Sequence, residues 1–231
     1  MYNLLLKKLN NSKKMSKNKK EEDEQIIFKI ITLGNSGVGK TSIIKRYVFN
    51  QFDQSAISSI GVIFSFKDVL IGGDENKKVK LKLIDTAGEE KYRSLSKTYY
   101  KNAEAVLFVF ALNNEESFTE ITDWLKTFKE NSNTIEIPKY LIGNKSDLER
   151  VIDNEKIEEC SQSNNLKYIE TSAKDNQNID DLFNEIANNL YESYIKKAGL
   201  NNKQNVSQLK LTYKGQDKKG KSNCCRITGD P

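Results

Sequence analysis

A run of nine residues, GNSGVGKTS at positions 34–42, constrains the fold of this chain more than any other feature. The near-continuous apolar stretch IIFKIITL (26–33) leads into the run, and the helix-like stretch TSIIKRYVF begins inside it. A strand that ends in a glycine-rich turn before a helix presents backbone N–H groups and the positive end of the helix to an anion. The residues that fit the pattern G-x-x-x-x-G-K-[ST] are Gly34, Gly39, Lys40 and Thr41. We therefore predict a phosphate-binding loop; a glycine-rich turn without a ligand is the alternative.

The residues of this loop have expected roles. The glycines allow successive N–H groups from Ser36 to Thr41 to point at phosphate oxygens. Lys40 is expected to reach the β- and γ-phosphates, and the Thr41 hydroxyl is expected to bind Mg²⁺. The other residues predicted to bind nucleotide here are Gly34, Gly37, Val38, Gly39 and Ser42.

Apolar runs alternate with helical patterns between residues 26 and 198, which is the signature of an α/β fold. The near-continuous apolar runs at 105–112 and 139–143 are typical of parallel strands covered on both faces. The segment 78–84 alternates strictly between lysine and apolar residues and is predicted to be an edge-type strand. The segment 61–71 is predicted to pair with it antiparallel through the Gly- and Asp-rich turn IGGDENKK.

A helical apolar pattern predicts the last helix from Ile179 to Ile195, with Asn178 as its N-cap and Gly199 as its stop. The sequence pattern changes before residue 26 and after residue 198. We predict an N-terminal extension (1–25), one folded domain (26–198) and a flexible tail (199–231). Seven Lys against four acids give the extension +3, and six Lys plus one Arg against two Asp give the tail +5, so the domain carries 5 − 3 − 5 = −3.

Asp85 stands at the end of the alternating segment and opens the run DTAGEE. A carboxylate at that place can hold a water of the Mg²⁺ shell, because the ion prefers oxygen ligands and keeps several waters. Gly88 supplies a backbone N–H group that can donate a hydrogen bond to a γ-phosphate. We therefore predict that this run completes the phosphate site.

Two later segments, LIGNKSDL (141–148) and ETSAK (170–174), predict which base is bound. Each ends an apolar strand, where open parallel sheets bind ligands. Asp147 can accept from the N1–H and the exocyclic amine of guanine, a donor pair that adenine lacks. Asn144 and the stem of Lys145 can order the loop and cover the base. The ETSAK segment adds Ser172, Ala173 and Lys174, with the Ala173 N–H directed at guanine O6.

With these motifs in order, residues 26–198 resemble the Ras superfamily of small GTPases, and within it the Rab family of membrane-traffic regulators. The Rab-like stretches are IGVIF (60–64), KLKLI (80–84), KYRSL (91–95), YYKNAEA (99–105) and VLFVFALNNEESF (106–118). The resemblance implies a P-loop G domain: a six-stranded, mostly parallel sheet with helices on both faces. It also implies a slow GTPase that switches between GTP and GDP and regulates vesicle traffic.

The resemblance further implies two loops that order around GTP·Mg²⁺ and loosen with GDP. Effectors, exchange factors and activating proteins are expected to bind through residues 52–64 and 86–98, and the protein is expected to be monomeric. Phe52 resembles the aromatic residue at the edge of the guanine. Ser59 stands where the family has its Mg²⁺-binding Thr.

Four residues depart from the Rab pattern: Ser59 replaces Thr, Ala56 replaces Tyr, Ile63 replaces Asp, and Glu89 replaces the Gln that orients the attacking water. The catalytic residues that the resemblance implies are therefore Lys40, Gly88 and Glu89. An ionised Glu accepts a hydrogen bond from water but has no NH₂ to donate to the phosphoryl group. The alternative to a working GTPase is a nucleotide-binding regulatory module with little or altered hydrolysis.

The cysteines and the charge define the expected surroundings. The absence of His excludes a His-ligated metal and a triad with a His base, and the three Cys indicate no disulfide framework, so a reducing cytosol fits best. The basic tails lack the interleaved aromatics of a stacking platform, so we expect no nucleic-acid partner.

Cys224 and Cys225 resemble the prenylated pair of Rab tails. Two lipid chains give stable anchoring, which implies the cytoplasmic face of an endomembrane, in exchange with the cytosol. The six residues RITGDP follow the pair, whereas a plain Rab tail ends with the cysteines. Two inert, exposed thiols are the alternative.

Overall fold

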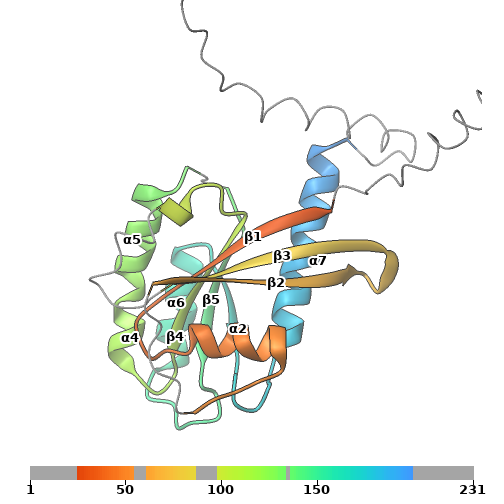
Figure 1. Cartoon of the computed structure of the whole chain (residues 1–231). Coiled ribbons are helices and arrows are strands. Elements are labelled where there is room, and N and C mark those ends of the chain that lie inside the picture. The colour runs from red at the N-terminus through yellow and green to blue at the C-terminus, as the bar shows by residue number, and fades with distance from the viewer. Residues whose placement is uncertain (1–24, 55–60, 87–97, 134–135, 200–231) are drawn as a thin grey trace, which may run out of the picture.

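The computed structural model describes residues 25–54, 61–86, 98–133 and 136–199, which form one sheet flanked by helices (Figure 1). The strands are β1 (Ile26–Leu33), β2 (Val62–Ile71), β3 (Asp74–Thr86), β4 (Ala105–Ala111), β5 (Lys139–Asn144) and β6 (Lys167–Glu170). The helices are α2 (Lys40–Phe49), α4 (Glu115–Thr119), α5 (Ile121–Asn131), α6 (Asn154–Ser163) and α7 (Ile179–Lys197). The predicted site residues that lie outside the described residues are Ser59, Gly88, Glu89, Cys224 and Cys225.

The described strands form a six-stranded sheet in the order β2-β3-β1-β4-β5-β6. β2 and β3 are antiparallel, and each of the other neighbouring pairs is parallel. The predicted α/β sheet and the predicted hairpin are thus confirmed. Because the parallel strands share one direction, the loops that follow β1, β3, β5 and β6 meet at one end of the sheet.

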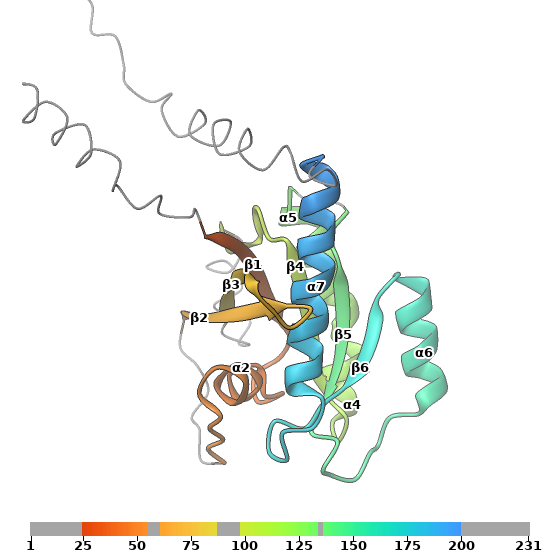
Figure 2. The same ribbon diagram turned by 90° about the vertical axis from the view of Figure 1, so that its right-hand side faces the viewer.

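Apolar clusters cover the two faces of the sheet, and the two views show helices on both sides (Figure 2). On one face, Tyr47 of α2 stacks on Phe183 of α7 with ring centroids 4.0 Å apart. On the other, Trp124 and Phe128 of α5 pack on the strands. The expectation of helices on both faces is therefore confirmed.

The prediction that the alternating segment 78–84 is an edge strand is wrong. β2 forms the edge, and β3 lies between β2 and β1. Val79, Leu81 and Leu83 are fully buried in the cluster that includes α2 and α7, whereas the lysines between them point to the other face. The alternation thus reports a strand covered on one face in this region, which an interior strand also allows.

The last helix, α7, begins and ends where the sequence predicts. Asn178 occupies the N-cap position, but its side chain does not cap the helix: its amide donates to the carbonyl of Glu170 at 2.8 Å. Gly199, with a φ of 63°, follows the last turn and suits the left-handed conformation there. Within the described part of the chain, no helix combines the length and the apolar character that crossing a bilayer requires.

Candidate nucleotide-binding site

The loop between β1 and α2 has no room for a side chain at two of its glycines. A Cβ at Gly34 would lie 2.1 Å from the carbonyl oxygen of Val109 in β4, and a Cβ at Gly39 would lie 2.2 Å from Nδ2 of Asn144. Gly39 also has a φ of 99°, in the region that favours glycine. The glycines therefore let the loop lie directly against β4 and against the end of β5, just before α2.

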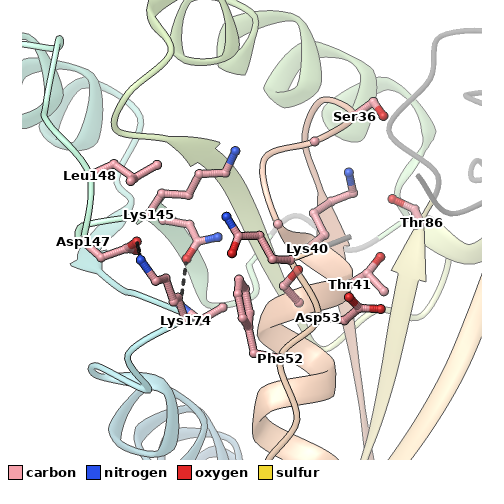
Figure 3. A pocket seen from close by; sticks show the side chains of 16 residues that line it. Ser36, Lys40, Thr41, Phe52, Asp53, Thr86, Lys145, Asp147, Leu148 and Lys174 are labelled. Carbon is pink, nitrogen blue, oxygen red and sulfur yellow. Dashed lines mark hydrogen bonds and ion pairs between the residues drawn. The ribbon is translucent and has the colours of Figure 1, made fainter. Parts of the chain in front are cut away.

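Lys40, the first residue of α2, is buried under this loop (Figure 3). Its ammonium donates to the carbonyl oxygens of Gly34 at 2.8 Å and of Asn35 at 2.7 Å. Burial lowers the pKa of Lys40 from 10.5 to about 8, while the nearby carboxylate of Asp85 acts in the opposite direction. A bound phosphate would favour the charged form in the same way, because an anion stabilises the ammonium.

Thr41 and Asp85 meet beside Lys40. The Thr41 hydroxyl donates to Oδ2 of Asp85 at 2.6 Å, and Asp85 is buried near the end of β3. Parallel pairing of β1 with β3 brings the strand end that carries Asp85 next to the loop that carries Thr41. A hydroxyl and a carboxylate are the oxygen donors that Mg²⁺ prefers, so the pair fits that ion.

Asn144 connects the phosphate loop to the loop after β6. Its Nδ2 donates to the carbonyl of Val38 at 2.8 Å, and its Oδ1 accepts from the Thr171 hydroxyl at 3.2 Å and from the Ala173 N–H at 3.3 Å. All of these atoms are buried. Asn144 therefore orders both loops rather than pointing at a base.

Asp147 has a carboxylate that is held in place from two sides. Its Oδ1 accepts from the Ser172 hydroxyl at 2.7 Å, and its Oδ2 lies 3.6 Å from Nζ of Lys174. The side chain is only 8% exposed. Ser172 thus acts through Asp147, and the fixed carboxylate can select a ligand that offers paired N–H donors.

One pocket of about 310 Å³ joins the phosphate loop to the loops of Asp147 and Ala173 (Figure 3). Predicted residues that line it are Ser36, Gly37, Gly39, Lys40, Thr41, Ser42, Phe52, Asn144, Lys145, Asp147, Ala173 and Lys174. Burial lowers the pKa of Lys145, and Asp147 opposes that shift. The pocket lies at the carboxyl ends of the parallel strands. One end is suited to phosphates and the other to a base, which is the layout of a nucleotide-binding site.

Comparison with known proteins agrees with this layout. A model of the Ras family matches residues 29–192. The chain is similar to Ras-related protein Rab-13 of Rattus norvegicus, with 34% identity over 201 residues, 86% of this chain and 95% of the relative. It is also similar to Ras-related protein SEC4 of Saccharomyces cerevisiae, with 38% identity over 204 residues, 86% of this chain and 91% of the relative.

The chain belongs to the Ras family. It is also 40% identical to Ras-related protein Rab-11B of Dictyostelium discoideum over 172 residues, 74% of this chain and 76% of the relative. It is therefore a Rab-like small GTPase, a GTP hydrolase that binds guanine nucleotide.

Some predicted residues of this Ras-family site lie next to the pocket and not on its wall. Gly34 lies against Val109, the carbonyl of Val38 accepts from Asn144, and Asp85 contacts Thr41. The lining residues that sequence reasoning missed are Asp53, Gln54, Thr86 and Leu148.

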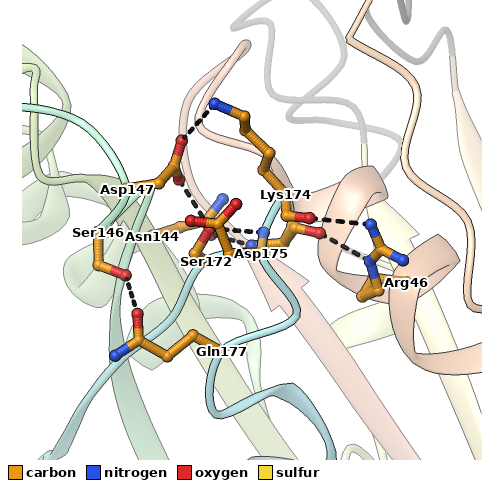
Figure 4. Close-up of polar contacts among 9 residues, drawn as sticks. Arg46, Asn144, Ser146, Asp147, Ser172, Lys174, Asp175 and Gln177 are labelled. Carbon is orange, nitrogen blue, oxygen red and sulfur yellow. Dashed lines mark hydrogen bonds and ion pairs between the residues drawn. The ribbon is translucent and has the colours of Figure 1, made fainter.

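Two further residues of the Ras-family domain support the site from a distance along the chain. Arg46 of α2 donates from Nε to the carbonyl of Ala173 at 2.8 Å and from Nη2 to that of Lys174 at 3.0 Å (Figure 4). Trp124 of α5 donates from Nε1 to Oδ1 of Asn35 at 2.8 Å. Neither contact has a local sequence signal, because each joins residues that only the fold brings together.

Proposed function

We propose that this Rab-like GTPase is a switch in vesicle traffic that holds GTP with Mg²⁺ in one state and GDP in the other. The observation that carries the proposal is the single pocket that runs from Lys40 and Thr41 to Asp147 and Ala173. Phosphates at the first end and guanine at the second belong to one nucleotide.

Guanine is selected by the fixed carboxylate of Asp147, which accepts from N1–H and the exocyclic amine. Phe52 and the stem of Lys145 line the same pocket and flank the base. Ala173 N–H, which donates to Asn144 at a long 3.3 Å, is directed to guanine O6 when the base is bound. The pocket thereby excludes adenine, which offers no such donor pair.

At the phosphate end, the hydroxyls of Thr41 and Ser59 and the carboxylate of Asp85 would hold Mg²⁺. That ion would supply positive charge to neutralise the phosphate oxygens. Lys40 contacts the β- and γ-phosphates, and the Gly88 N–H contacts the γ-phosphate. Residues 52–64 and 86–98 then present the bound state to effectors, exchange factors and activating proteins.

Glu89 sets how fast the switch turns off. Its carboxylate can accept from the attacking water, but it brings a negative charge toward the γ-phosphate. Two unit charges about 4 Å apart interact by about 4 kcal/mol at an effective dielectric constant of about 20. GTP in the ground state feels part of this repulsion too, so hydrolysis persists with a changed rate and a changed response to an activating protein. A nucleotide-binding module with little hydrolysis is the second candidate, and the identity of Glu89 is what favours it.

Single-turnover hydrolysis of bound GTP separates the two candidates. The full-length protein and its Glu89→Gln variant are compared with and without membrane extract as a source of activator. The switch predicts measurable phosphate release that differs between the two proteins. Equal rates in both conditions contradict the proposed role of Glu89, and no release from the native protein favours the binding module.

The tail carries the membrane part of the proposal. Prenylation of Cys224 and Cys225 would anchor the protein to the cytoplasmic face of an endomembrane, from which it exchanges with the cytosol as a monomer. Mass spectrometry of the native protein tests this directly. Unmodified Cys224 and Cys225 in a full-length chain contradict it.

A further inference from the structure

Three lysines lie on one face of β3, opposite the residues on which α2 and α7 pack. We call this surface the lysine face; it consists of Lys78, Lys80 and Lys82 with Ile27 and Phe66 beside them. The strand register places Phe66 next to Lys82 and Ile27 next to Lys80. Ile27 is 51% exposed and Phe66 is 50% exposed, so the face is open to a partner.

The lysine face has more positive charge than its own acids balance. Among the described residues, Asp68 is the carboxylate that pairs with these lysines, at 2.8 Å from Lys78 and 3.6 Å from Lys80. The Lys82 ammonium lies 4.9 Å from the ring centre of Phe64. Alternate residues of one strand are about 7 Å apart, so these ammonium groups repel one another and favour an additional anion.

The chain enters the fold at this same face. The Gln25 side chain donates from Nε2 to Oδ1 of Asp68 at 3.0 Å, immediately before β1 begins. The four residues that precede Gln25 are all acidic, in the run EEDE at 21–24. An extended segment of four residues spans about 14 Å, which is also about the distance along a strand from Lys78 to Lys82.

We propose that the acidic run 21–24 folds back from Gln25 and binds the lysine face of its own chain. Glutamate and aspartate carboxylates then pair with Lys80 and Lys82, and the run shields Phe66 and Ile27. The face continues into Phe64, which is 41% exposed and belongs to the region proposed for partner binding. A protein partner that uses this face must therefore displace the acidic run. Only that consequence rests on the proposed function; the intramolecular contact does not.

Carbodiimide crosslinking of the full-length protein tests the contact, because the reagent joins only carboxylates and amines that touch. We expect links from residues 21–24 to Lys80 or Lys82 in several-fold higher yield than links to Lys45, an exposed lysine of α2 on the opposite face. The links should fall in about 1 M salt, where the Debye length is about 3 Å. A mixture of ¹⁵N-labelled and unlabelled protein should give linked peptides from single molecules.

A matched variant gives a second measurement. Glu21→Gln, Glu22→Gln, Asp23→Asn and Glu24→Gln together remove the charge and keep the size of the run. Acylation of Lys80 and Lys82 should become several-fold faster in this variant, while that of Lys45 stays the same.

Three results would overturn the proposal. The first is a set of crosslinks that reaches Lys78 but gives a yield at Lys82 no higher than at Lys45. The hydrogen bond from Gln25 to Asp68 would by itself explain links to Lys78. The second is acylation rates that the neutral variant leaves unchanged. The third is protection of Lys80 and Lys82 that appears only with phosphatidylserine vesicles, which would assign the face to a membrane.

Discussion

The indole Nε1 of Trp124 donates to Oδ1 of Asn35 across 2.8 Å, which ties α5 to the phosphate-binding loop. Trp124 is completely buried, and it is the one tryptophan of the chain. The carbonyl of the same Asn35 accepts from Lys40 at 2.7 Å. Through two hydrogen bonds, α5 thus helps to set the position of Lys40, the lysine that we propose contacts phosphate.

We expect this link to slow nucleotide release. A neutral hydrogen bond contributes about 0.5–1.5 kcal/mol, so Trp124→Phe and Asn35→Ala should each speed GDP release roughly 2- to 10-fold. Because both substitutions remove the same hydrogen bond, the double variant should release GDP hardly faster than the more affected single variant. The measurement is the rate at which a fluorescent GDP analogue is released from the native protein, the two single variants and the double variant. Fully additive effects would show that the bond does not couple the two residues.

Asp147→Asn should change which base is bound. The amide replaces one acceptor oxygen with a donor, so it no longer matches the N1–H and amine of guanine but can donate to the C2 carbonyl of xanthine. Hydrogen bonds to charged groups contribute about 1.5–3 kcal/mol, so GTP should bind roughly 10- to 100-fold more weakly, with a gain for xanthosine triphosphate. Asp153→Asn, at an exposed N-cap, is the matched control and should leave both affinities unchanged.

The pKa of Lys40 predicts a pH dependence. In the folded, nucleotide-free protein it is about 8, below the ordinary value of 10.5 that applies to the unfolded chain. Between these values the unfolded chain binds more protons, so the stability of the nucleotide-free protein should rise with pH from about 8 to 10.5. If GDP binds the charged ammonium, as we propose, its affinity should fall above pH 8, by up to about tenfold per pH unit.

Lys40→Arg tests this assignment, because arginine stays charged throughout that range. Any pH dependence that remains in the variant comes from other groups, including guanine itself. Equal slopes of GDP affinity against pH in the native protein and the variant would remove Lys40 as the cause.

The hydrogen bond between Thr41 and Asp85 predicts where Mg²⁺ acts. Thr41→Val keeps the shape of the side chain and removes the oxygen. We therefore expect chelation of Mg²⁺ to accelerate GDP release from the native protein but not from this variant. Thr41→Ser retains the hydroxyl and should behave like the native protein to within a few-fold. GDP release with and without EDTA is the measurement, and an undiminished effect of EDTA in Thr41→Val would contradict the Mg²⁺ role.

Much of this arrangement is predictable from local sequence. Near-continuous apolar runs predict the strands β1 and β5, because strands covered on both faces allow few polar residues. The spacing around Gly34, Lys40 and Asp147 predicted the two ends of the pocket, because tight backbone turns and charged acceptors need specific residue types. The sequence predicts Asn178 at the N-cap of α7, and it occupies that position. Its side chain does not cap the helix, however, because its amide donates to the carbonyl of Glu170.

The remainder depends on contacts between distant residues. Alternation in β3 shows which face is covered, but not whether β2 lies beyond it, so the edge assignment failed. Arg46 and Trp124 carry no motif, and their bonds to Ala173 and Asn35 exist only because α2 and α5 pack beside the loops. Such side chains can be found only after the fold is known.

Identification of the nucleotide that stays bound to the purified full-length protein is the sharpest test that the pocket is specific for guanine nucleotides. After denaturation and chromatography, we expect close to one guanine nucleotide per protein, GDP or GTP, and no adenine nucleotide. A stoichiometric adenine nucleotide, or no nucleotide together with equally weak binding of added GTP and ATP, would contradict it.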